Sequence, residues 1–145
     1  MARADFRFAH PFRVRYAETD AQGVVFNANY LTYYDVAITE YLRVIGWDYK
    51  AHIGTGVDFH IVKGLVEYKG PLRFDDEFEV AVRTARLGNS SLTFALEVHP
   101  KGRDRVLATG EVVWVNTDQT SHKPAPVPND LRTRIERYEQ MGAAV

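Results

Sequence analysis

Hydrophobic and polar residues alternate along several segments of the chain. The clearest are residues 60–68, 77–87, 91–99 and 105–116. In the second of these, Phe78, Val80 and Val82 share one parity. A period of two places such side chains on one face of a strand, so we predict four strands here. A looser alternation over residues 7–16 predicts another strand near the N-terminus.

One segment has a helical period instead. Apolar and aromatic residues recur there at spacings of three and four, at Tyr30, Tyr34, Ala37, Ile38, Tyr41, Leu42 and Ile45. This spacing predicts an amphipathic helix that buries one stripe of side chains. We expect Asn27 or Asn29 to cap its N-terminus and Gly46 to end it. Residues 47–59 predict a loop with room for one helical turn, and residues 131–138 predict a short helix.

One long helix and a run of antiparallel strands define an α+β domain. The most economical packing lays the sheet around the helix, which buries the helical stripe. A chain of 145 residues is long enough to bury a core within one domain. Because the sequence contains no internal repeat or linker, we interpret residues 1–145 as a single domain.

Charge and composition narrow the classes of function. The formal net charge is −1, so no overall field attracts nucleic acid or an anionic membrane. No apolar run approaches the roughly 20 residues that span a bilayer, and the N-terminus lacks an apolar signal core. The chain contains no cysteine, which excludes disulfides, thiolate nucleophiles and cysteine-ligated metals. We therefore expect a cytoplasmic protein that binds neither nucleic acid nor membranes.

The candidate chemistry lies just before the long helix, in residues 16–30. Asp20 stands there in a short turn that contains Gly23. This layout directs a carboxylate and the free N–H groups of a helix N-terminus toward one small volume. A carboxylate can activate water or attack a carbonyl, and free N–H groups can hold the resulting oxyanion. The residues themselves therefore predict acyl transfer or hydrolysis.

Other catalytic chemistries lack their sequence signatures. The five histidines are scattered, and no H-x-x-x-H or H-E-x-x-H pair suggests a metal site. The chain contains no G-x-S-x-G elbow, no P-loop and no G-x-G-x-x-G fingerprint. We therefore expect neither a metal nor an organic cofactor.

Residues 20–30, with the pattern D-x-x-G-V-V-F-N-x-N-Y, resemble the 4-hydroxybenzoyl-CoA thioesterase-like branch of the hotdog-fold acyl-CoA thioesterases. The resemblance runs nearly end to end, through residues 66–76, 89–94 and 123–128. It implies a hotdog fold, with an antiparallel sheet wrapped around one long central helix. It also implies hydrolysis of an acyl-CoA thioester without a cofactor, in a homodimer or homotetramer with active sites between subunits.

The resemblance implies roles for two residues of the first motif. Asp20 matches the catalytic carboxylate, and Asn27 matches the position whose backbone N–H binds the thioester oxygen. The positions implied to contact substrate are Tyr16, Gly23, Val25, Tyr30, Ser90, Ser91 and Lys123. Among these, the two serines lie where the family contacts the CoA arm, and the lysine could meet its phosphates.

Alternative interpretations remain at this point. An isolated aspartate in a loop is commonly an Asx-turn former, and Gly23 can simply permit a positive φ. Several relatives carry His or Tyr at the position of Asn27, so any contribution of such a side chain is missing here. The same cleft would also serve a non-catalytic acyl-CoA-binding or sensor module. A hotdog dehydratase or hydratase usually places a catalytic His in this loop, which has none.

Overall fold

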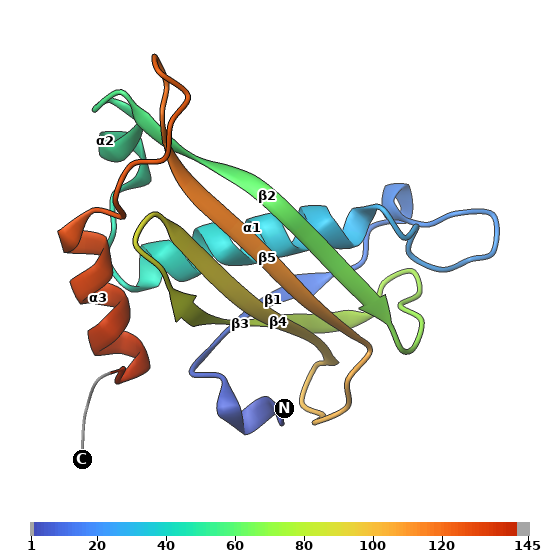
Figure 1. Ribbon diagram of the computed structural model, residues 1–145. Helices are drawn as coiled ribbons and strands as arrows, with labels where there is room; N and C mark the ends of the chain where they lie inside the picture. The colour runs from blue at the N-terminus through green and yellow to red at the C-terminus, as the bar shows by residue number, and fades with distance from the viewer. Residues whose placement is uncertain (1, 142–145) are drawn as a thin grey trace.

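An antiparallel sheet of five strands forms the centre of the computed structural model, which describes residues 2–141 (Figure 1). The strands are β1 (Phe8–Arg13), β2 (Val57–Tyr68), β3 (Glu77–Leu87), β4 (Ser91–Pro100) and β5 (Ala108–Asp118). Their order across the sheet is β1-β3-β4-β5-β2, so β1 and β2 form its edges. The five predicted strands are therefore confirmed.

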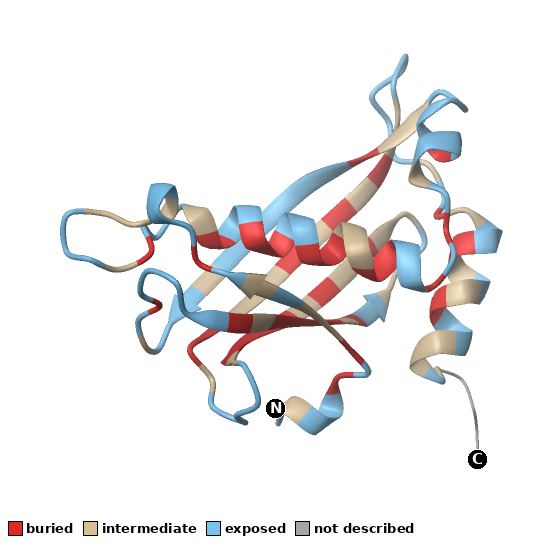
Figure 2. Cartoon of the chain, turned by 180° about the vertical axis from the view of Figure 1, so that it is seen from behind, coloured by how far each residue is buried: buried red, intermediate tan, exposed pale blue. Residues whose placement is uncertain are grey.

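The long helix α1 (Asn29–Val44) lies across one face of this sheet. All seven residues of the predicted stripe are buried, together with Tyr33. They pack against inward-facing side chains such as Val82, Phe94 and Trp114, while the outer side of the helix is exposed (Figure 2). This arrangement confirms the α+β class and the sheet wrapped around a helix.

Two shorter helices complete the chain, α2 (Tyr49–Ile53) and α3 (Asn129–Glu139), with short 3-10 turns η1 (Arg3–Asp5) and η2 (Tyr16–Glu18). Within residues 2–141, no helix combines the length and the apolar character needed to cross a membrane. The helical turn expected between residues 47 and 59 is α2.

Several strand boundaries differ from the sequence prediction, and β1 in particular ends at Arg13 rather than at residue 16. Strand β2 begins three residues early, because Val57 already pairs with Asp118 of β5. Strand β5 begins at Ala108 rather than at residue 105, because residues 101–105 belong to the exposed connection from β4. Strand β2 is exposed along almost its whole length, and only Phe59 is buried (Figure 2).

The two ends of α1 follow different rules. At the C-terminal end, Gly46 has a φ of 86°, and the N–H of Trp47 donates to the carbonyl of Leu42. This is a Schellman motif, which confirms glycine as the stop signal. At the N-terminal end the predicted asparagine cap is wrong. Ala28 holds the cap position. The side-chain amide of Asn29 donates instead to the carbonyl of Glu18 in the preceding loop, at 2.9 Å.

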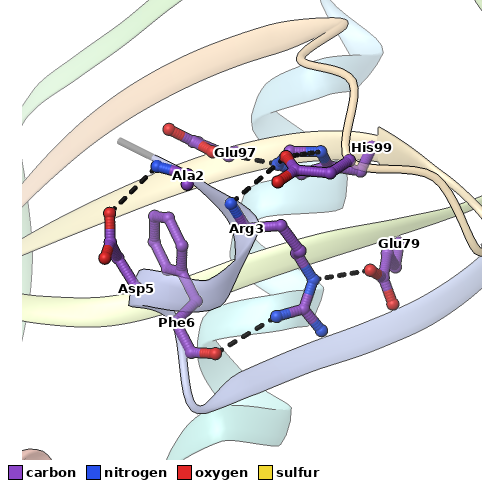
Figure 3. Close-up of polar contacts among 8 residues, drawn as sticks. Ala2, Arg3, Asp5, Phe6, Glu79, Glu97 and His99 are labelled. Atoms are coloured by element: carbon purple, nitrogen blue, oxygen red, sulfur yellow. Dashed lines mark hydrogen bonds and ion pairs between the residues drawn. The ribbon is translucent and has the colours of Figure 1, made fainter.

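A buried polar cluster ties the N-terminal turn to the sheet face opposite α1 (Figure 3). The ring of His99 is fully buried, and its Nε2 lies 2.9 Å from a carboxylate oxygen of Glu97. Arg3 donates from Nε to Glu79, at 2.6 Å. Turn η1 is therefore tied to Glu79 of β3, the residue that pairs with His99 of β4.

Candidate active site

A tight loop before α1 positions Asp20. The N–H of Gly23 donates to the carbonyl of Asp20, and the N–H of Asp20 donates to the carbonyl of Val24, both at 2.9 Å. Gly23 has a φ of 77°, a conformation that side-chain-bearing residues adopt only with strain. The loop is tied to the rest of the fold by the Val25 N–H, which donates to Leu72 at 2.8 Å. These hydrogen bonds and the turn at Gly23 therefore fix the position of Asp20.

The carboxylate of Asp20 is only partly engaged. Its Oδ1 accepts a hydrogen bond from the N–H of Gln22 at 2.8 Å, which is an Asx turn. Its Oδ2 receives no donor from any residue between 2 and 141. The turn-forming role of Asp20 is therefore present, and it leaves the second oxygen free for chemistry.

A cavity of about 310 Å³ adjoins this loop. Four of the residues predicted from the sequence meet in its lining, namely Asp20, Val25, Asn27 and Tyr30. They come from the loop and from the start of α1. The opposite wall includes Tyr68 and Pro71, at and just after the end of β2.

The start of α1 offers unpaired backbone donors to this region. The N–H of Asn29 donates to the carbonyl of Phe26, and the N–H of Tyr30 donates to that of Asn27. The N–H groups of Asn27 and Ala28 have no acceptor within the described part of the chain. Such free groups stand at the positive end of the helix dipole, where a negatively charged oxygen is stabilised.

Tyr68 is a site residue that the sequence did not reveal. Its hydroxyl donates to the carbonyl of Asn27 at 2.9 Å, and its ring packs edge-on against Tyr30 at a centroid distance of 5.1 Å. Burial raises the pKa of Tyr30, and the neighbouring Tyr68 adds to the effect. Tyr68 ends a predicted strand, but strand periodicity does not indicate what lies beside the strand's last residue.

Glu18 is a second residue that the sequence did not reveal, and it anchors the loop. Its side chain is 12% exposed and accepts hydrogen bonds from the Tyr33 hydroxyl at 2.7 Å and from the Arg15 N–H at 2.9 Å. Burial alone would raise the pKa of Glu18, but these hydrogen bonds and the Arg15 guanidinium hold it below its usual value. The carbonyl of Glu18 accepts from the Asn29 amide and from the Phe26 N–H.

Two predicted residues lie near the loop but do not line the cavity. Tyr16 is exposed, and its ring packs edge-on against Phe74 at a centroid distance of 5.9 Å. Gly23 shapes the turn without reaching the cavity wall.

Three further predicted residues lie at the other end of the sheet. Ser91 is the first residue of β4 and Ser90 directly precedes the strand; Ser91 pairs with Val115 near the end of β5. The carbonyl of Lys123 accepts from the N–H of Asp118, the last residue of that strand. The cavity adjoins the opposite end of β5. Within a single chain, Ser90, Ser91 and Lys123 therefore lie at the opposite end of the sheet from the loop that carries Asp20.

A larger cavity, of about 560 Å³, lies at the C-terminal end of α1, around Gly46 and Trp47. It contains none of the residues predicted to act. Across residues 2–141, no group of three or more His, Asp or Glu side chains is placed to hold a metal ion.

Known proteins resemble this chain along most of its length. A family model described as the thioesterase-like superfamily matches residues 14–135. The acyl-CoA thioester hydrolase YbgC of Escherichia coli is 34% identical over 124 residues, which cover 86% of this chain and 92% of that protein. The putative acyl-CoA thioesterase YneP of Bacillus subtilis is 30% identical over 112 residues, which cover 77% and 80%.

A solved structure shows the same similarity in three dimensions. The crystal structure of the PA5185 protein from Pseudomonas aeruginosa superposes with a TM-score of 0.84, at 29% identity, over 94% of both chains. The sheet and central helix therefore match in architecture as well as in sequence. This chain belongs to the thioesterase-like superfamily and has the hotdog fold.

Proposed function

We propose that this protein hydrolyses acyl-CoA thioesters to the free acid and CoA, with Asp20 as the catalytic carboxylate. The observation that carries the proposal is the cavity lined by Asp20 and Asn27. Within residues 2–141, one carboxylate oxygen of Asp20 has no donor and the backbone N–H of Asn27 has no acceptor. Relatives named as acyl-CoA thioester hydrolases support the choice of substrate.

The chemistry needs only these groups. The free oxygen of Asp20 takes a proton from water, and the hydroxide attacks the thioester carbonyl; alternatively the carboxylate attacks directly and water then cleaves the anhydride. In both routes the carbonyl oxygen becomes an oxyanion, which the N–H groups at the start of α1 stabilise. The C–S bond then breaks, and the CoA thiolate leaves and takes up a proton.

The oxyanion donor belongs to the backbone, so the identity of side chain 27 matters little. The side chain of Asn27 is exposed and makes no hydrogen bond with residues 2–141. We propose that Asn serves at this position as well as the His or Tyr expected in relatives.

We also propose that the protein acts as a homodimer or homotetramer, with each active site between two subunits. Strand β2 is an edge strand with exposed apolar side chains at Ile61, Val62 and Leu65. An edge of this kind invites pairing with a second chain. In such an assembly, Ser90, Ser91 and Lys123 of one subunit would contact the CoA arm of a substrate whose acyl group lies at the partner's Asp20.

A thiol-release assay tests the proposed activity. Purified protein is incubated with short, long and aromatic acyl-CoAs in the presence of EDTA, and free thiol is followed over time. We expect release above the buffer rate for at least one acyl-CoA. No release from any of them, with CoA still bound in calorimetry, would favour the non-catalytic binding module instead.

Light scattering tests the proposed assembly. A chain of 16.5 kDa should scatter at micromolar concentration as a particle of two or four times that mass. A monomer under these conditions would contradict both the assembly and the active site between subunits.

A further inference from the structure

The peptide group between Asn27 and Ala28 is hydrogen-bonded on one side only. Its oxygen accepts from the Tyr68 hydroxyl at 2.9 Å and from the Tyr30 N–H at 3.3 Å. Its N–H, which belongs to Ala28, has no acceptor within residues 2–141. The group therefore receives two donors at its carbonyl end and presents an unused donor at the other.

Hydrogen bonds to a carbonyl change the opposite end of the same peptide. The peptide unit is planar, so a contact that holds the oxygen also fixes the direction of the N–H. Hydrogen bonds along a chain also polarise one another, by perhaps 10–30% per bond. A donor at the Asn27 oxygen thus makes the Ala28 N–H both better oriented and more positive.

We infer that Tyr68 is a positioning residue for the proposed hydrolysis. Its hydroxyl holds and polarises the Asn27–Ala28 peptide, so that the Ala28 N–H joins the N–H of Asn27 in binding the thioester oxyanion. The inference rests on the proposed function of the same cavity. It adds a second backbone donor and a side chain from β2 that acts through it.

The exposure of Tyr68 separates this role from simple packing. Within the single chain Tyr68 is 52% exposed, so its hydroxyl could bond to water there at little cost. A hydrogen bond that replaces one to water contributes only about 1 kcal/mol to stability. Its main consequence is therefore the geometry of the peptide, which it fixes from the edge strand, 41 residues away along the chain.

Kinetics of Tyr68→Phe give the first test, because this change removes the hydroxyl and keeps the ring. We expect kcat to fall about tenfold, with KM within twofold of wild type, because the affected bond forms only in the transition state. The matched control is Tyr138→Phe, which removes a hydroxyl on α3 and should leave kcat unchanged. A Tyr68→Phe kcat within twofold of wild type, or a rise in KM alone, would overturn the inference.

Nuclear magnetic resonance gives a second test that does not depend on activity. The amide ¹⁵N shift of Ala28 responds to hydrogen bonding at the Asn27 carbonyl. We expect this resonance to move in Tyr68→Phe and to stay in place in Tyr138→Phe. An unmoved resonance would overturn the inference even if kcat fell. Failure of the proposed function is a different result, since the wild-type protein would then release no thiol.

Discussion

The ring of Tyr34 lies directly against the backbone of Gly110. A Cβ at Gly110 would stand 2.2 Å from Cε2 of that ring, far inside van der Waals contact. Tyr34 is fully buried, and its hydroxyl donates to the carbonyl of Thr109 at 2.9 Å. Helix α1 can therefore approach β5 this closely only because the strand has no side chain at this point.

This contact predicts a large cost for Gly110→Ala. The added methyl group must displace a buried aromatic ring, and overpacking of this kind costs about 3 kcal/mol. The control is Gly64→Ala, whose Cβ would meet only the flexible end of Leu31, at 3.2 Å. Urea unfolding of both variants checks the prediction. Equal losses of unfolding free energy would show that the fit between helix and sheet is looser than the contact implies.

The glycine of the loop that carries Asp20 supports a second prediction. Gly23 and Gly56 both have a positive φ, 77° and 88°, and a Cβ at either would meet no atom within 4 Å. Alanine at either site should therefore cost about 1 kcal/mol of stability, through backbone strain alone.

Only Gly23→Ala should also lower kcat, because its turn holds Asp20 in place. Steady-state kinetics beside thermal unfolding of the two variants separates the effects. A fall in kcat for both variants, or for neither, would contradict the positioning role of the turn.

Glu18 predicts a specific dependence of stability on pH. Its pKa in the folded protein lies below the ordinary value of 4.5, so the unfolded chain binds this proton more readily. The stabilisation from Glu18 is therefore complete above about pH 4.5 and is lost as the pH falls through the lowered folded value. Glu18→Gln should cost about 1.5 kcal/mol at pH 7, and the difference from wild type should shrink in acid.

Urea unfolding at a series of pH values checks this, with Glu136→Gln as the control because Glu136 is exposed on α3. A Glu18→Gln deficit that stays constant or grows in acid would show that its carboxylate is not preferentially stabilised in the folded state.

Local patterns explain which parts of the fold could be predicted. The burial of Tyr41 and Phe94 follows from periods of 3.6 and 2 that are visible in short windows of sequence. The glycine stop after α1 was equally local. The predicted asparagine cap failed, because the side-chain amide of Asn29 donates to the carbonyl of Glu18 in the preceding loop. Propensity predicts where a polar group suits a helix end, but not which partner competes for it.

In the candidate site too, residues of one short loop could be predicted, whereas residues whose roles depend on tertiary contacts could not. Asp20 and Asn27 could be predicted to share a volume because one short loop carries both. Glu18 and Tyr68 could not, because their roles depend on contacts with Tyr33 and Asn27 that only the folded chain creates. The predicted CoA-arm residues depend on a neighbouring subunit and stay predictions.

The most direct test of the central claim is kcat for Asp20→Asn. Asparagine keeps an oxygen that can accept from the Gln22 N–H, so the turn should survive, but the charge and most of the basicity are lost. We predict that kcat falls on the order of 10²-fold or more, with folding unchanged by circular dichroism. Asn27→Ala should change kcat far less, because the proposed donor there is the backbone. Near wild-type turnover of Asp20→Asn would contradict the account.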